Sequence, residues 1–134
     1  MNARAIPTAA VVLAILALFG CGGDDDDEGG SAAEGPSIRT VEINERDFSL
    51  DPARISLPES GVYTLHVVNR GQTTHALGVE GVGVEEETPE LAPGESADLK
   101  IDVDEGDYDM YCPVDDHKGM GMEGRIVVAG ANTE

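Results

Sequence analysis

The sequence is short of basic residues, and this shortage excludes one class of function. Eight Lys and Arg residues stand against 27 Asp and Glu residues, which gives a formal net charge of −19. Binding to nucleic acid is driven by clusters of Lys and Arg at the phosphates, so the composition argues against a nucleic-acid partner. It favours a protein partner with a basic surface, or simply solubility in a salty environment.

No apolar run is long enough to cross a membrane as a helix. The stretch from Ala9 to Phe19 is wholly apolar but has only 11 residues, whereas a spanning helix needs about 20. With Arg4 ahead of it, this layout is typical of an export signal over residues 1–20. Such a signal can lead to ordinary export, with cleavage by a signal peptidase at one of several residues, or to attachment of a lipid.

Leu18-Phe19-Gly20-Cys21 resembles the lipobox of bacterial lipoproteins. The resemblance implies that Cys21 is lipidated and becomes the first residue of the mature protein. We therefore expect an exported protein anchored by lipid on the outer face of the cell membrane, or in the periplasm. Residues 21–37 include five consecutive acidic residues and no apolar periodicity, which predicts a disordered, solvated tether.

Only two cysteines are present, Cys21 and Cys112. If Cys21 carries lipid, Cys112 has no disulfide partner in an oxidising compartment. A lone thiol would be a liability there unless the protein uses it. Cys112 is therefore a candidate functional residue.

Long stretches with helical periodicity are also missing, and short strands separated by turn residues take their place. In Ser96–Val103 apolar and charged residues alternate, which marks a half-buried strand. Gly61–Asn69 is rich in β-branched residues and predicts another strand. Further strands are expected around Val41 and Ile43, around Ile55 and Leu57, and over Arg125–Val128.

These patterns predict an all-β domain over residues 38–130, followed by a tail at 131–134. We expect a Greek-key β-sandwich or barrel of about seven to eight strands, and a monomer. The expected core is aliphatic, and its large aromatic residues are Phe48, Tyr63, Tyr108 and Tyr111.

Sulfur and imidazole donors gather near the C-terminus in YCPVDDHKGMGMEGRIVV, residues 111–128. Thiolate and thioether ligands suit copper, whereas thioether is not a usual zinc ligand. Two histidines, one cysteine and a weak axial methionine form the copper site used in electron transfer. A second histidine is needed beside His117. His75 follows a turn and is the better candidate, because His66 lies inside a regular strand and is expected to be a surface residue.

NRGQTTHALGV, residues 69–79, and the segment 111–128 resemble the two metal-binding segments of the cupredoxins, the small blue copper proteins. The spacing of the second segment is closest to that of rusticyanin-like members. The resemblance implies one copper ion, held strongly by His75, Cys112 and His117 and axially by Met122. Met120 is the competing axial residue.

The resemblance also implies that electrons pass through the exposed edge of His117 to a redox partner protein. We expect an uncharged docking patch around it, made of Pro113, Gly119 and Met120. Carboxylates beside this patch would steer a basic partner, and salt would weaken that attraction.

The sequence departs from the family pattern at two places. Ala76 replaces the Asn that often follows the first histidine, so we expect that the side-chain hydrogen bond that braces the ligand loop is absent. The backbone N–H groups of Ala76 and Val114 can still reach the Cys112 sulfur. Asp115-Asp116 replaces a frequent Pro-Gly pair. These carboxylates should favour Cu(II), giving a lower reduction potential than in an Asp115→Pro/Asp116→Gly variant.

Other functions remain open from the sequence. A module that delivers or buffers copper would have a similar loop, and a domain that has lost its metal would keep the fold. Multicopper oxidases and nitrite reductases need histidines beyond the blue site, and the chain has three in all. A Cys112–His117 nucleophile pair would leave the methionine and the second histidine unexplained. We therefore expect no enzymatic activity.

Overall fold

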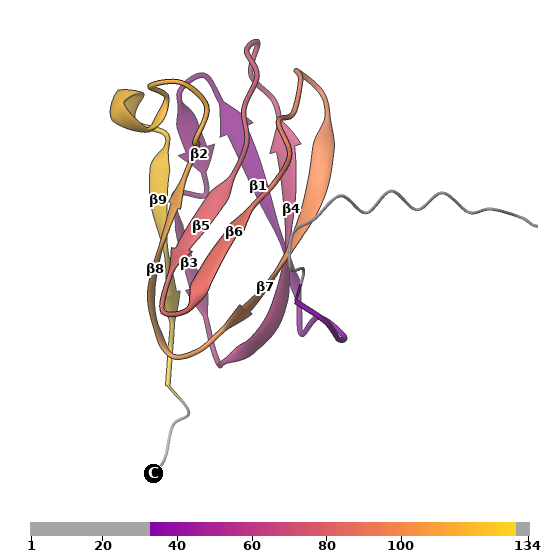
Figure 1. The fold of residues 1–134 in the computed structure, drawn as a ribbon, viewed down its shortest axis with the longest axis vertical. Coiled ribbons are helices and arrows are strands. Elements are labelled where there is room, and N and C mark those ends of the chain that lie inside the picture. Colours follow the sequence, from indigo (N-terminus) through magenta and orange to yellow (C-terminus); the bar gives the residue numbers. More distant parts are fainter. Residues whose placement is uncertain (1–32, 131–134) are drawn as a thin grey trace, which may run out of the picture.

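The computed structural model describes residues 33–130, so the predicted signal, Cys21 and the tail at 131–134 lie outside the described residues. Two sheets form a β-sandwich, as expected (Figure 1). One sheet has the order β2 (Ser49–Asp51), β1 (Thr40–Arg46), β4 (Gly61–Asn69) and β7 (Ser96–Val103). The other has the order β3 (Arg54–Leu57), β9 (Glu123–Val128), β8 (Gly106–Tyr111), β5 (Gly78–Gly81) and β6 (Val84–Glu87).

The described residues form nine strands, compared with the seven or eight that the sequence predicts. The prediction of β4 and β7 is confirmed at both ends of each strand, because their alternation is regular. β9 begins two residues before the predicted Arg125, at Glu123. No helix in the described part of the chain is long and apolar enough to span a membrane.

The core lies between the two sheets and is aliphatic, as expected. Leu65 of β4 stands opposite Leu99 of β7, and both are buried. Tyr63 and Tyr108 are buried among these residues. Phe48 is half-buried and packs against this core, which agrees with the expectation in part. Tyr111 is half-buried and does not belong to the core cluster, so the expectation for it is wrong.

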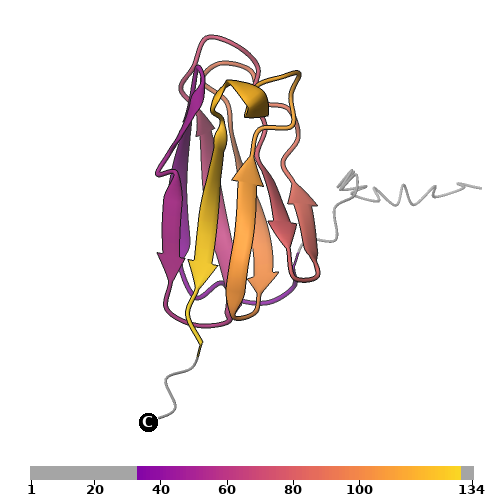
Figure 2. The ribbon, with the colours of Figure 1, turned by 90° about the vertical axis from the view of Figure 1, so that its left-hand side faces the viewer.

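Strand direction brings distant segments together at the end of the sandwich that carries the histidines. β1 runs parallel to β4, from Thr40 opposite Thr64 to Glu45 opposite Asn69. The residues after β1 therefore lie beside the loop that leaves β4. β8 ends and β9 begins at this end, joined by a loop with the short 3-10 helix η1 (Lys118–Met120), at the upper end of the five-stranded sheet in Figure 2.

Candidate metal centre

Two loops carry the sulfur and imidazole donors, and backbone hydrogen bonds fix each loop. His75 exchanges two backbone hydrogen bonds with Leu91, at N···O distances of 3.0 and 2.7 Å. Cys112 follows β8 directly, and its N–H donates to the carbonyl of Met122 at 3.0 Å. Met122 in turn donates to the carbonyl of His117 at 3.1 Å. The second loop therefore closes on itself around its three donor residues.

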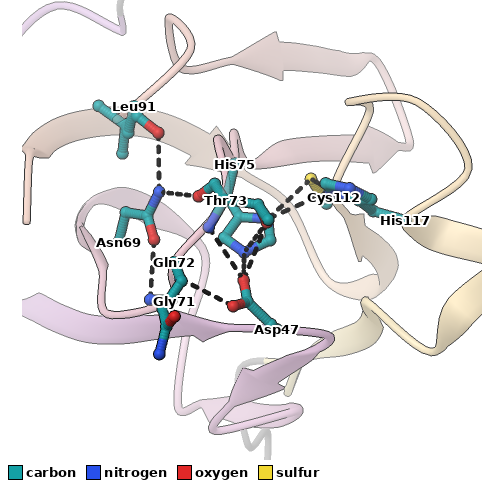
Figure 3. A network of polar contacts seen from close by, with 9 residues as sticks. All are labelled: Asp47, Asn69, Gly71, Gln72, Thr73, His75, Leu91, Cys112 and His117. Atoms are coloured by element: carbon teal, nitrogen blue, oxygen red, sulfur yellow. Dashed lines mark hydrogen bonds and ion pairs between the residues drawn. The ribbon is translucent and has the colours of Figure 1, made fainter. Parts of the chain in front are cut away.

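The structure brings His75, Cys112 and His117 into one buried cluster (Figure 3). The Nδ1 atoms of the two histidines are 3.2 Å apart. The Cys112 Sγ atom lies 3.9 Å from Nδ1 of His75 and 3.7 Å from Nδ1 of His117. His75 and Cys112 are fully buried, and His117 is 8% exposed. These three side chains therefore face one point from two loops.

The two candidate axial methionines lie in different environments. Met122 is fully buried, and its backbone is tied to both Cys112 and His117. Met120 lies in η1 and is 54% exposed. Burial therefore favours Met122 over Met120 as the residue that faces the cluster.

The donor set fits one copper ion. Nε2 of His75 makes a hydrogen-bond contact with the carboxylate of Asp47, and Nδ1, on the other side of the ring, faces His117 and Cys112. Two imidazole nitrogens and a thiolate, with a methionine beside them, match the preferences of copper in electron-transfer sites. Nδ1 of His75, Nδ1 of His117 and the Cys112 sulfur are the atoms that would hold such an ion.

The Cys112 sulfur accepts hydrogen bonds from the backbone N–H groups of Ala76 and Val114, which confirms the expectation for these two residues. Pro113, between Cys112 and Val114, has no N–H to give. Burial raises the pKa of the Cys112 thiol, the two N–H groups oppose that shift, and the charges of Glu45 and Asp115 add to it. A bound cation would favour the thiolate by its own charge.

Asp47 is a site residue that the sequence reasoning missed. Its Oδ1 lies 2.7 Å from Nε2 of His75, and its carboxylate also accepts from Gln72 and Thr73 (Figure 3). The pKa of Asp47 is lowered to about 2, chiefly by the backbone hydrogen bond from Gln72. Burial opposes this shift, and weaker hydrogen bonds from His75 and Thr73 add to it. No local pattern pointed to Asp47, because the contact depends on the parallel pairing of β1 with β4.

Phe48 is a second residue that the sequence did not place at the site. Its ring centroid lies 4.9 Å from that of His117 and 6.2 Å from that of His75. The aromatic ring therefore packs against both histidines and helps to keep water from them.

His66 lies on β4, away from the cluster, as the sequence predicts. Its side chain is 38% exposed and pairs with Asp98 on β7, at 2.6 Å between Nδ1 and Oδ1. In the predicted docking patch, Gly119 and Met120 are exposed and Pro113 is half-buried.

A comparison with family profiles identifies the family. A family profile for the cupredoxin-like domain matches residues 9–128, which is most of the chain. The chain belongs to the cupredoxin family. No curated protein matches this cupredoxin.

Solved structures of low sequence identity share its fold. The cupredoxin resembles auracyanin B with a TM-score of 0.67 and 21% identity, over 75% of this chain and 96% of that chain. It resembles auracyanin A of Chloroflexus aurantiacus, described as a "blue" copper protein, with a TM-score of 0.58 and 15% identity, over 66% of this chain and 97% of that one. A copper-containing nitrite reductase (NirK) from Thermus scotoductus SA-01 matches with a TM-score of 0.58 and 18% identity, over 71% of this chain but 28% of its own length.

Proposed function

We propose that this cupredoxin is a type 1 (blue) copper protein that carries single electrons. The observation that carries the proposal is the convergence of His75, Cys112 and His117 in a buried site. When bound there, copper would supply a one-electron Cu(II)/Cu(I) couple. The fold shared with auracyanin A, itself described as a "blue" copper protein, supports this function.

The residues of the site are suited to electron transfer because they are held in place. We infer that Cys112 and the two histidines are the strong ligands and that Met122 is the weak axial one. The N–H groups of Ala76 and Val114 fix the sulfur, and Asp47 fixes the ring of His75. A constrained donor set changes little between oxidation states, which keeps the reorganisation cost of electron transfer small.

Electrons would leave through His117, the ligand nearest to solvent. His117 is 8% exposed, whereas His75 and Cys112 are fully buried. The docking patch of Pro113, Gly119 and Met120 would make the apolar contact with the redox partner. We expect that partner to be basic, and its association to slow as salt screens the acidic surface of the cupredoxin.

We also propose that lipid on Cys21 anchors the protein outside the cytoplasm, with residues 21–37 as the tether and the domain as a monomer. Cell fractionation tests the anchor. The wild-type protein should sediment with membranes, and a Cys21→Ser variant should appear in the soluble fraction. Equal distribution of the two proteins would show that Cys21 does not anchor the domain.

A copper titration tests the proposed function. Metal-free protein should bind one Cu(II) and gain an intense charge-transfer band with narrow copper hyperfine splitting in electron paramagnetic resonance. The Cys112→Ser variant should lack the band, because the thiolate is its source. His66→Gln serves as the control and should keep it. A weak tetragonal signal together with ready transfer of Cu(I) to a chelator would point to copper delivery, and absence of binding would point to a metal-free domain.

A further inference from the structure

Asp47 occupies a position from which it reaches the loop that carries His75. It follows the last residue of β1, Arg46, and β1 lies parallel to β4. The Asp47 side chain is 25% exposed, and His75 against it is fully buried. The contact between them is therefore partly shielded from water on its His75 side, and charge interactions are screened less there than between fully exposed groups.

The loop after β4 is built around the Asp47 carboxylate (Figure 3). Oδ2 accepts from the N–H of Gln72 at 2.8 Å, and Oδ1 lies 2.9 Å from Oγ1 of Thr73 and 2.7 Å from Nε2 of His75. Several hydrogen-bond donors around a carboxyl group favour its ionised form, which can only accept hydrogen bonds.

Gly71 leaves the space that this arrangement needs. A Cβ atom on Gly71 would collide with Oδ1 of Asp47 and lie 2.8 Å from Nε2 of His75. Asn69 holds the loop from its other side, since its Oδ1 accepts from the N–H of Gly71 at 2.9 Å and its Nδ2 donates to the carbonyl of Thr73 at 2.8 Å. The loop therefore presents Asp47 and His75 to each other in one orientation.

Two consequences follow for the ring of His75. The hydrogen bond to Asp47 places the proton on Nε2, which leaves Nδ1 free to face Cys112 and His117. A negative charge behind the imidazole also makes it a stronger electron donor and favours the more highly charged state of a bound ion.

We propose that Asp47 is a positioning residue of the copper site, which fixes the Nε2–H tautomer of His75 and lowers the reduction potential of the site. The part concerning the potential rests on the proposed electron-carrier function. The part concerning the tautomer does not, because it describes the metal-free protein as well.

The chain contains a matched control for this pair. His66 and Asp98 make a histidine–aspartate contact of 2.6 Å on the outer face of the sheet of β1, β2, β4 and β7, with side chains 38% and 64% exposed. Asp47→Asn and Asp98→Asn therefore remove one charge from pairs of similar N···O distance, one at the site and one on the surface. Asp47→Ala removes the acceptor as well.

Nitrogen-15 NMR of the histidine rings in the metal-free protein, above neutral pH, tests the tautomer. The wild type and Asp47→Asn should keep the His75 proton on Nε2, because the asparagine carbonyl can still accept. Asp47→Ala should give a mixture of tautomers, and copper affinity should fall by about tenfold or more. A pure Nε2–H tautomer in Asp47→Ala would overturn the positioning role. If Asp47→Ala does not fold, Asp47→Leu, which fills the space, takes its place.

The reduction potential, measured by spectroelectrochemistry on the copper-loaded protein, tests the charge. Asp47→Asn should have a higher potential than the wild type, and Asp98→Asn should have the wild-type value. Equal potentials for the wild type and Asp47→Asn, or equal shifts in both variants, would overturn the claim. If the wild type forms no blue site, the proposed function fails, and the NMR result still decides whether Asp47 positions His75.

Discussion

Glu45 and Asp47 are two residues apart at the end of β1, and their carboxyl groups meet opposite conditions. Asp47 accepts hydrogen bonds from the loop after β4, and its pKa falls to about 2, chiefly through the N–H of Gln72. Glu45 is fully buried, and neither of its carboxyl oxygens has a hydrogen-bond partner among the described residues. Burial raises the pKa of Glu45 to about 7.

The difference shows that burial and hydrogen-bond donors together decide the charge of an acidic residue near this site. Glu45 lies inside β1 and points into the core with Ile43, whereas β1 has ended before Asp47 and its side chain turns to the loop. The charge of Glu45 also raises the pKa of the Cys112 thiol, so the two groups are within electrostatic range of each other. The metal centre thus has one carboxylate with donors and one carboxyl without them.

The largest expected effect is a loss of stability with rising pH that depends on Glu45. Its pKa is about 7 in the folded protein and 4.5 ordinarily, so the unfolded chain releases this proton first. The free energy of unfolding is therefore highest, as far as Glu45 decides it, below pH 4.5, where the carboxyl group is protonated in both states. It falls by about 3 kcal/mol as the pH rises through 7. Urea unfolding of the metal-free protein at a series of pH values measures it.

Glu45→Gln is the matched variant for that measurement, because it keeps the size and removes the titration. The free energy of unfolding of Glu45→Gln should depend less on pH than that of the wild type in the window from 4.5 to 7. Identical pH profiles for the two proteins would mean that Glu45 finds a partner or water in solution. The contrast with Asp47 would then not hold.

The next largest effect is a loss of stability when the space beside Asp47 and His75 is filled. Gly71→Ala would place a methyl group against Oδ1 of Asp47 and Nε2 of His75. Overpacking of this kind costs about 1–3 kcal/mol, because backbone or side chains must move. Urea unfolding should detect this loss, and the His75 tautomer should become mixed.

Gly119→Ala is the control for Gly71→Ala, since a Cβ at Gly119 would meet no atom within 4 Å. Its stability should stay within about 0.5 kcal/mol of the wild type. If Gly71→Ala were as stable as Gly119→Ala, the loop would be adaptable. The fixed orientation of Asp47 and His75 would then be in doubt.

Sequence reasoning found the parts of the molecule that depend on local patterns. Apolar and polar residues alternate regularly in β4 and β7, and the first and last residues of both strands were predicted correctly. The strands β5 (Gly78–Gly81) and β6 (Val84–Glu87) were missed, because they are short and contain Gly or consecutive Glu residues. Cys112, His117 and Met122 lie within one loop, so their spacing was readable.

The surroundings of the site could not be read in the same way. Asp47 reaches His75 across 28 positions of sequence, and only the parallel pairing of β1 with β4 brings them together. The burial of Glu45 was also missed. The sequence of β1 predicts a strand with one exposed face, and an acidic residue in such a strand is expected on that face. Long-range pairing, which the sequence alone did not reveal, therefore decides how the ligands are supported.

Asp115 and Asp116 are exposed, so their carboxylates can be compared with that of Asp47 as charges near the site that lie in water. The Asp115→Pro/Asp116→Gly variant is a poor test of their charge, because Asp115 has φ of 46° and proline is confined to about −65°. The Asp115→Asn/Asp116→Asn variant keeps the loop, since asparagine tolerates positive φ. Its reduction potential should rise by an amount on the order of tens of millivolts, about 59 mV being a tenfold change in a one-electron equilibrium.

Voltammetry at low and high salt checks this assignment. The rise should shrink with salt, because exposed charges are screened. The Asp47→Asn shift should shrink less with salt, because the Asp47–His75 contact is partly buried and His75 is fully buried. A salt-independent rise in the Asp115→Asn/Asp116→Asn variant would place these carboxylates closer to the site than their exposure implies.

The smallest effect is expected at the exposed pair of His66 and Asp98. Their contact of 2.6 Å is as short as that of His75 with Asp47, at 2.7 Å. Exposed ion pairs contribute about 0–1 kcal/mol because water and salt screen them. Asp98→Asn should therefore change the free energy of urea unfolding by no more than about 0.5 kcal/mol. A larger loss would mean that the geometry of a histidine–aspartate pair matters even in water, and burial would no longer explain why the pair at His75 differs.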